Sequence, residues 1–373
     1  MRICIVSHGD EFIKLYRTLK DVYDIRYVLE RDCESWGMTE EGIACISFGR
    51  AYQLYKSGEI EAFLIPCMRG INIKIGIFDR LTRNGVSADN ILYAPLRFFR
   101  DKDISEDERK GLICLFKDRS EIDFLAMHIA DGCNLGCAYC SVLSGSCGTE
   151  EMVPLDDILH SVDLLSGVCD QVTVFRLLGG EPLLNPDWPE ICARVKSRFP
   201  LADVEIVTNG LLLPSLPDER LRWMSEQGIT FDITDYSILG GKIDEIHERL
   251  SRLNVRHYIT QEVEYFSRLY DFERARDPEE NYEVCRMKFM CMNMRGYKLS
   301  VCHAAVGLER AAKMFPEISY EDTGAVDLRT EGITFKDIME KLDRPHDMCK
   351  YCNQDLTGWH RVSDRTDIKE WSL

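Results

Sequence analysis

Three thiols fall within eight residues in the stretch Cys133-Asn134-Leu135-Gly136-Cys137-Ala138-Tyr139-Cys140. It follows directly on residues 124–130, an apolar run typical of a buried strand. A loop placed there can wrap three thiols around one inorganic centre. A structural zinc site normally takes four ligands, and a redox dithiol needs only Cys137 and Cys140. Thiolates also hold iron-sulfur clusters, in which a cubane with three protein ligands leaves one iron open to another molecule.

The sequence around these cysteines alternates between strand-like and helical segments. It predicts strands at residues 124–130, 172–178, 204–207, 229–234 and 255–259, and helices at residues 155–165, 188–198, 219–227 and 243–253. Repeated βα units predict a parallel sheet with its chemistry at the carboxyl ends of the strands. Five strands in about 140 residues are too few for a closed eight-fold barrel, so we expect a partial (βα) barrel over residues 120–280.

Glycines and polar side chains follow the later predicted strands. The second strand leads into Gly179-Gly180-Glu181-Pro182, and the third into Thr208-Asn209-Gly210. Glycine lets a backbone approach a ligand closely, and a carboxylate suits an ammonium group. Asp232 and Thr234 end the fourth strand. They either point into the same opening at the carboxyl ends of the strands or form a turn before the next helix.

Three motifs, each directly after a predicted strand, resemble those of the radical S-adenosylmethionine (SAM) superfamily. They are C-x3-C-x2-C, Gly-Gly-Glu-Pro and Thr-Asn-Gly. The resemblance implies a [4Fe-4S] cluster on Cys133, Cys137 and Cys140 whose open iron is chelated by SAM. It implies reductive cleavage of SAM to a 5′-deoxyadenosyl radical, which removes a hydrogen atom from a substrate. A reductant such as flavodoxin or ferredoxin is implied as well. The cofactor contacts expected on this basis are Tyr139, Gly179, Gly180, Glu181, Thr208, Asn209, Asp232 and Thr234.

A second group of cysteines lies near the C-terminus, at Cys285, Cys302, Cys349 and Cys352. Gly296 marks the turn of a predicted hairpin, residues 289–294 and 297–302. Four thiolates suit zinc as well as iron. The pattern is similar to the C-terminal domains of the same superfamily that bind an auxiliary [4Fe-4S] cluster. No cysteine follows Cys352, so it resembles the shortened, single-cluster relative of the SPASM domain, the twitch domain, over residues 281–373.

The first 101 residues are not covered by the resemblance. Strands at residues 3–7, 62–66 and 90–94 and helices at residues 11–19 and 72–84 predict a small Rossmann-like α/β domain over residues 1–101. Its first turn, Ser7-His8-Gly9-Asp10, lacks G-x-G-x-x-G, which favours a scaffold, docking or vestigial nucleotide domain. The charged residues after it predict a linker over residues 102–119 or a solvated helix.

The amino-acid composition limits the classes of partner that the protein is expected to bind. The 373-residue chain carries 46 Lys and Arg against 63 Asp and Glu, a net charge of −17, which makes attraction to phosphate backbones unfavourable. We therefore expect no nucleic-acid partner. No apolar stretch approaches the ~18 residues of a membrane span, and no export signal opens the chain, so we expect a cytoplasmic protein without a membrane partner.

The expected function is that of a radical SAM oxidoreductase or isomerase. Single-cluster members that this chain resembles dehydrogenate or invert carbinols of cyclitols and sugars, which favours a small carbohydrate or nucleotide-sugar substrate. In an epimerisation Cys291 is the candidate hydrogen donor if Cys285 is the cluster ligand, and an inert hairpin thiol is the alternative. Two other readings stay open: peptide or protein modification with residues 1–101 as a docking module, and a noncatalytic iron-sulfur or zinc protein.

Overall fold

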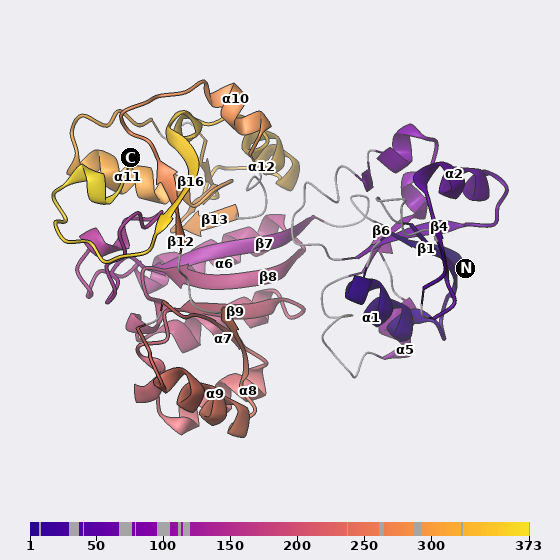
Figure 1. Ribbon diagram of the computed structural model, residues 1–373, viewed down its shortest axis with the longest axis horizontal. Helices are drawn as coiled ribbons and strands as arrows, with labels where there is room; N and C mark the ends of the chain where they lie inside the picture. The colour runs from indigo at the N-terminus through magenta and orange to yellow at the C-terminus, as the bar shows by residue number, and fades with distance from the viewer. Residues whose placement is uncertain are drawn as a thin grey trace. The chain divides into compact units, whose positions relative to one another are not determined.

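The computed structural model describes residues 1–6, 9–29, 37–39, 41–66, 77–78, 80–94, 105–110, 113–114, 120–236, 238–260, 265–285, 292–321 and 324–372. The chain divides into two compact units, Met1–Asp123 and Phe124–Leu373 (Figure 1). Each is described by itself. The limits expected for a linker over residues 102–119 and for a separate domain from residue 281 stay predictions.

The N-terminal unit is a six-stranded sheet in the order β3-β2-β1-β4-β5-β6. Its strands are β1 (Arg2–Val6), β2 (Asp24–Leu29), β3 (Ala44–Ile46), β4 (Ala62–Pro66), β5 (Ile91–Ala94) and β6 (Ile113–Cys114). All neighbours pair in parallel except β5 and β6. Side chains of β1 alternate between two cores: Ile3 and Ile5 pack with α1 (Gly9–Leu19), and Cys4 and Val6 with α2 (Phe48–Lys56). Helices on both faces of a parallel sheet confirm the predicted α/β architecture.

Strands β2, β3 and β6 and helix α2 of this unit were not predicted. Strand β2 exposes Asp24 and Arg26, and β3 has only three residues, so neither forms a continuous apolar run. Within the predicted linker, α5 (Glu106–Lys110) is a short charged helix. It corresponds to the solvated helix that was the alternative to a linker. The turn Ser7-His8 lies outside the described residues.

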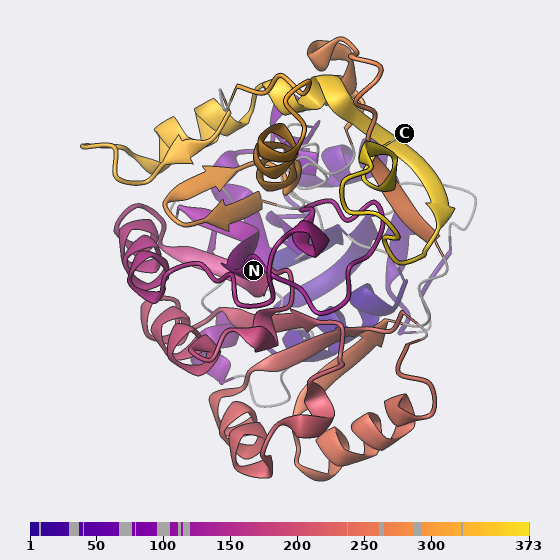
Figure 2. The ribbon, with the colours of Figure 1, turned by 90° about the vertical axis from the view of Figure 1, so that its left-hand side faces the viewer.

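The second unit contains the predicted partial barrel, within an eight-stranded sheet ordered β11-β10-β9-β8-β7-β13-β14-β15. The five predicted strands are β7 (Glu121–Ala130), β8 (Gln171–Gly179), β9 (Asp203–Thr208), β10 (Thr230–Thr234) and β11 (Arg256–Thr260). Strands β8 to β11 pair in parallel. The connecting helices line the outside of the curved sheet (Figure 2): α6 (Leu155–Val168), α7 (Trp188–Arg198), α8 (Asp218–Gln227) and α9 (Lys242–Arg252).

The predicted hairpin is present as β13 (Met292–Arg295) and β14 (Lys298–Ser300), with Gly296 at φ 54° in the turn. Strand β13 also pairs in parallel with β7, from Met292 opposite Leu125 to Arg295 opposite His128. The hairpin therefore continues the barrel sheet, and β15 (Val326–Asp327) extends it further. This pairing was not predicted. It covers the edge of β7, which would otherwise leave backbone groups unpaired.

After β11 the chain leaves this sheet. Strand β12 (Tyr265–Tyr270) pairs in antiparallel fashion with β16 (Cys352–Gly358) in a sheet of two strands. Among the described residues the core thus stops at its fifth predicted strand. Three helices complete this part: α10 (Pro278–Glu283), α11 (Ala304–Met314) and α12 (Phe335–Leu342). Within the described ranges no helix combines the length and apolar character needed to cross a bilayer.

Candidate functional site

A cavity of about 300 Å³ lies where the carboxyl ends of β7, β8, β9 and β10 come together. Four consecutive strand ends contribute to its lining. Of the residues predicted to bind the cluster or SAM, the cavity is lined by Cys133, Cys137, Cys140, Gly179, Gly180, Thr208, Asn209 and Thr234. Tyr139, Glu181 and Asp232 are not among the lining residues. The sequence signals therefore converge on one space, although they are up to about a hundred residues apart in the chain.

The three cysteines are carried by a tight loop, residues 131–149, which we call the cysteine loop. Burial raises the pKa of Cys133 to about 11 and that of Cys137 to about 12, and the neighbouring thiols add to each shift. Such thiols ionise readily only against a cation or a metal. Among the described residues no three His, Cys, Asp or Glu side chains lie within reach of a single metal ion. The fit to a cluster rests instead on three thiols that line one cavity, of which Cys137 is buried and Cys133 and Cys140 are half-buried.

Gly179 and Gly180 allow β8 to end against the backbone of the cysteine loop. A Cβ on Gly179, whose φ is 143°, would lie 2.0 Å from the carbonyl oxygen of Ala130, and one on Gly180 would lie 2.0 Å from that of Gly132. The Gly180 N–H donates to the Ala130 oxygen at 2.9 Å, and the Glu181 N–H to the Gly132 oxygen at 2.9 Å. The glycines were predicted to admit a ligand; in the structure they also admit the loop itself.

Glu181 is completely buried and joins two strand ends. Its Oε1 accepts hydrogen bonds from the Thr208 hydroxyl at 2.8 Å and the Leu183 N–H at 3.1 Å, and its Oε2 accepts one from the Asn209 N–H at 3.0 Å. Burial raises the pKa of Glu181 to about 7 although these bonds oppose the shift. The carboxylate thus fixes Thr208 and Asn209, and its predicted contact with the SAM ammonium stays a prediction.

We expect Glu181→Ala to weaken SAM binding by roughly 1.5–3 kcal/mol, because three donors lose their acceptor and the Asn209 backbone loses its anchor. Calorimetric titration of SAM into reconstituted protein measures this, with iron content determined on the same sample. An unchanged dissociation constant would contradict the role, and loss of iron would show that Glu181 holds the cysteine loop instead.

Asn209 connects the third strand end to the cysteine loop. Its Nδ2 donates to the Asn134 Oδ1 at 2.7 Å and lies 3.9 Å from the Cys133 sulfur, while its Oδ1 accepts from the Leu211 N–H at 3.0 Å. Asn134 was not predicted as part of the site. Its position between two cysteines is the only sequence signal that could have indicated it.

One part of the cavity wall is formed by β7, β8 and the hairpin. His128 is completely buried, its Nε2 lies 2.7 Å from the Asn293 Oδ1, and its Nδ1 has no hydrogen-bond partner. Burial lowers the pKa of His128 to about 3, so the ring is neutral. His303 lines the same wall. Asn293 and His303 could not be found from sequence, because nothing in the pattern places β13 beside β7.

Arg176, also in this wall, is held by two carboxylates. Its guanidinium contacts Glu205 at 2.8 Å and Asp232 at 2.7 Å, and it lies 4.7 Å from the centre of the Phe124 ring. The structure therefore engages Asp232, a predicted cofactor contact, in an ion pair at the edge of the cavity. Its contact with SAM stays a prediction.

Tyr139 is covered by the C-terminal segment, residues 359–372. Its N–H donates to the Glu370 oxygen at 2.8 Å, and its ring lies 4.8 Å from the Arg268 guanidinium carbon and 5.6 Å from the His360 ring. Figures 1 and 2 both show the yellow C-terminal segment beside the magenta cysteine loop. The predicted adenine contact of Tyr139 stays a prediction, and this cover was not foreseen.

Three of the C-terminal cysteines, Cys285, Cys349 and Cys352, are close enough to influence one another's ionisation. Burial raises the pKa of Cys352 to about 12 and also raises that of Cys349. The nearby Cys285 thiol raises both pKa values further. Tyr270, opposite Cys352 in the β12–β16 pair, lies near Cys302, and the Cys302 sulfur accepts from the Ala304 N–H at 3.4 Å. Cys291 lies outside the described residues, so its predicted role is not addressed.

Two buried hydrogen-bond donors near Cys352 have no acceptor among the described residues and suit a bound cluster. Arg276 Nε and Asn353 Nδ2 are buried without a hydrogen-bond partner. A thiolate-ligated cluster carries negative charge and accepts hydrogen bonds at its sulfurs, so these donors fit one. Asn281 supports the same ligands, because its Nδ2 donates to the Cys349 oxygen at 2.8 Å and the Cys352 oxygen at 3.3 Å.

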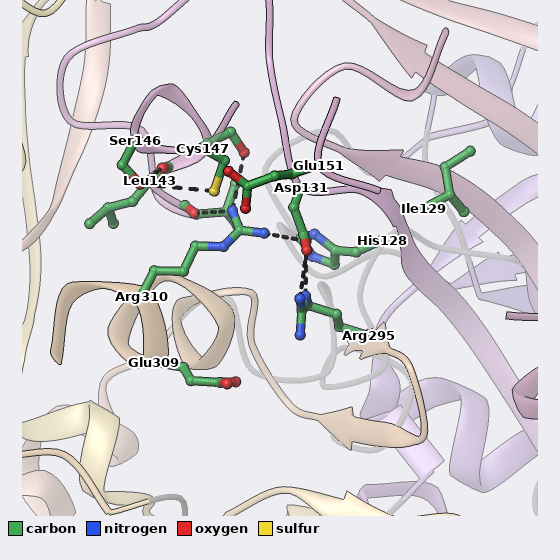
Figure 3. Close-up of polar contacts among 12 residues, drawn as sticks. His128, Ile129, Asp131, Leu143, Ser146, Cys147, Glu151, Arg295, Glu309 and Arg310 are labelled. Atoms are coloured by element: carbon green, nitrogen blue, oxygen red, sulfur yellow. Dashed lines mark hydrogen bonds and ion pairs between the residues drawn. The ribbon is translucent and has the colours of Figure 1, made fainter. Parts of the chain in front are cut away.

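Asp131, two residues before Cys133, holds the cysteine loop to the C-terminal part of the unit (Figure 3). Arg295 of β13 donates to it twice, at 2.9 and 2.6 Å, and Arg310 of α11 contacts its Oδ1. Arg310 also donates to the Val142 oxygen at 2.5 Å, two residues beyond Cys140, the last cysteine of the triad. Burial opposes ionisation of Asp131, but the two guanidinium groups outweigh it and lower the pKa. Helix α11 thus fixes the chain on both sides of the cysteine triad, through Arg310.

Asp131→Asn is expected to destabilise the chain by roughly 3 kcal/mol, because it leaves two partly buried guanidinium groups without their counter-charge. Since the pKa of Asp131 is lowered on folding, this contribution is present at neutral pH and lost as the pH falls below about 4. Urea unfolding followed by circular dichroism measures it.

Asp163→Asn is the matched control. Asp163 also binds two arginines, Arg194 and Arg198, but is about one-third exposed, so its replacement should lower the free energy of unfolding by under about 1 kcal/mol. Equal losses would contradict the assignment.

Comparison with known proteins agrees with this geometry. Residues 127–269 match the Radical SAM superfamily. The GTP 3′,8-cyclase of Lactiplantibacillus plantarum is 30% identical over 148 residues, which cover 36% of this chain and 43% of that protein. The GTP 3′,8-cyclase of Pelotomaculum thermopropionicum is 35% identical over 111 residues, 29% of this chain and 32% of that protein. The chain thus matches less than half the length of these curated relatives.

Two solved structures are similar as well. One is described as "Crystal structure of BtrN in complex with AdoMet and 2-DOIA", with a TM-score of 0.41, 16% identity, and coverage of 64% of this chain and 94% of that one. The other is "Native anSMEcpe with bound AdoMet", with a TM-score of 0.30, 18% identity, and coverage of 36% and 43%. The superfamily uses a [4Fe-4S] cluster and SAM. The match to the Radical SAM superfamily spans residues 127–269, which contain all three strand-end motifs.

Proposed function

We propose that this protein is a radical SAM enzyme that removes a hydrogen atom from a small hydroxylated substrate. The observation that carries the proposal is the convergence of three strand-end motifs on one cavity. Cys133, Cys137 and Cys140 are the proposed cluster ligands. Gly179, Gly180, Thr208, Asn209 and Thr234 form the surface on which SAM would lie. When bound, the cluster and SAM together supply a 5′-deoxyadenosyl radical.

The other lining residues of the cavity support a neutral, hydroxyl-rich substrate such as a sugar or cyclitol. They combine the rings of Phe124 and Tyr236 with the uncharged polar groups of His128 and Asn293. With Nε2 of the neutral His128 ring donating to Asn293, its Nδ1 is an acceptor suited to a hydroxyl group. The one cation in this lining, Arg176, is already paired with two carboxylates, which disfavours it as the main anchor of a phosphate among the residues the structure describes.

The test is transfer of deuterium into 5′-deoxyadenosine. Reconstituted protein is reduced with SAM and, in separate reactions, ring-deuterated myo-inositol, deuterated glucose, ribose-deuterated GTP, or a deuterated peptide library. Label from the cyclitol or the sugar supports the proposal. Label from GTP alone would favour a reaction like that named for the curated relatives, and label from peptides alone would favour peptide modification; either result would overturn the substrate class.

We further propose that Cys285, Cys302, Cys349 and Cys352 hold an auxiliary [4Fe-4S] cluster, which would accept an electron during dehydrogenation. Anaerobically reconstituted protein is expected to contain about eight irons per chain, falling to about four in Cys349→Ala/Cys352→Ala, because each cubane holds four. The double variant should also be less stable, since metal binding contributes to folding.

Iron, sulfide and zinc analysis gives the answer. Cys192→Ala is the matched control: it removes another buried thiol, in α7, and should retain about eight irons. About four irons with one zinc in the unmodified protein would contradict the auxiliary cluster and its electron-accepting role.

A further inference from the structure

The C-terminal segment, residues 359–372, lies along the cysteine loop as an added backbone layer. Cys137 and Arg361 form an isolated antiparallel bridge. The Ala138 N–H donates to the His360 oxygen and the Val362 N–H to the Gly136 oxygen, each at 3.0 Å. These contacts place the segment directly over Cys137, the middle cysteine of the triad.

Trp359 begins this segment with its indole turned toward Cys137. Its Nε1 is buried and makes no conventional hydrogen bond, and the polar group that it faces is the Cys137 thiol. The ring is fixed by Tyr236, whose ring centre lies 5.6 Å away and which itself lines the cavity. Leaving a buried N–H without an acceptor is unfavourable, so a strong acceptor at this place would be favoured.

We propose that the indole N–H of Trp359 donates a hydrogen bond to the Cys137 sulfur when that thiolate holds the SAM-binding cluster, and thereby raises the cluster's reduction potential. The inference rests on the proposed cluster. A thiolate bound to iron carries the negative charge that the free thiol lacks. Hydrogen bonds to cluster sulfurs stabilise the more negative, reduced state and are one determinant of the potential. Trp359 is therefore a positioning and tuning residue supplied by the end of the chain.

The first experiment compares Trp359→Phe with unmodified protein. Phenylalanine keeps an aromatic ring against Tyr236 but removes the N–H. Midpoint potentials are measured by redox titration with electron paramagnetic resonance detection, and the cluster of interest is identified as the signal that changes when SAM is added. The variant is expected to have a more negative midpoint potential, and therefore a smaller reduced fraction at a fixed applied potential.

Trp371→Phe is the matched control in the same segment. Trp371 is fully buried, and its Nε1 donates to the Arg365 oxygen at 3.2 Å and not to a thiol. Its replacement should leave the potential unchanged. Equal potentials in Trp359→Phe and unmodified protein, or an equal shift in both variants, would overturn the proposal.

A second measurement keeps the test valid if Trp359→Phe fails to retain iron. Unmodified protein containing tryptophan labelled with ¹⁵N at the indole nitrogen is reduced and studied by electron-nuclear double resonance. A ¹⁵N coupling to the SAM-responsive cluster, retained in Trp371→Phe, is expected. Absence of the coupling while that cluster is present would overturn this inference alone, whereas absence of any SAM-responsive cluster would overturn the proposed function with it.

Discussion

Simultaneous replacement of Cys133, Cys137 and Cys140 by alanine is expected to remove about four irons per chain and to abolish reductive cleavage of SAM. The three thiols are the only protein ligands expected for the SAM-binding cluster, and they line the cavity together. Without them no iron is available to bind SAM or to deliver an electron. Iron analysis and chromatographic quantitation of 5′-deoxyadenosine measure the two effects.

The C-terminal cysteines supply an internal control for this triple variant. They are far along the chain and should still hold their own irons, so about four of about eight should remain. Retained production of 5′-deoxyadenosine in the triple variant would contradict the assignment of the ligands. Loss of all iron would show that the two sites do not form independently.

Gly180→Ala is expected to have the second-largest effect. The new Cβ would lie 2.0 Å from the Gly132 oxygen and 2.9 Å from the Asp131 oxygen. These are backbone atoms of the cysteine loop, so they cannot rotate away as a side chain would. We expect a loss of about 3 kcal/mol in the free energy of unfolding, near the upper end of overpacking costs, and a large loss of SAM cleavage because the loop must shift.

Gly167→Ala is the control for this substitution. Gly167 lies in α6, and a Cβ there meets no atom within 4 Å. Alanine favours a helix over glycine by about 1 kcal/mol, so this variant should be as stable as the unmodified protein or more so. If Gly180→Ala behaves like Gly167→Ala, the close backbone approach is not a requirement of the site.

The elements that could be predicted from sequence are those defined by local patterns. Strands β7 to β10 are largely buried runs separated by amphipathic helices, and α7 matches its predicted bounds, residues 188–198. The cysteine triad, the glycine pair and Thr208-Asn209 were predicted because each follows a strand directly. Parallel strands then bring their carboxyl ends to one edge, which explains why motifs separated in sequence line one cavity.

The parts that could not be predicted depend on contacts between distant segments. His128 and Asn293 are 165 residues apart, and Asp131 and Arg310 are 179 apart. Neither pair has a periodic or compositional signature. The same is true of Trp359 against Cys137, because a tryptophan near a chain end is a common core or surface residue. These contacts arise from the pairing of β13 with β7 and of the C-terminal segment with the cysteine loop.

The most direct test of the account is the fate of SAM on reduction. Full-length protein reconstituted anaerobically with iron and sulfide is reduced with dithionite in the presence of SAM, and the products are separated by liquid chromatography and mass spectrometry. The account predicts 5′-deoxyadenosine and methionine in equal amounts, formed only by protein that contains the cluster on Cys133, Cys137 and Cys140. Intact SAM after reduction of a protein with its full iron content would contradict it.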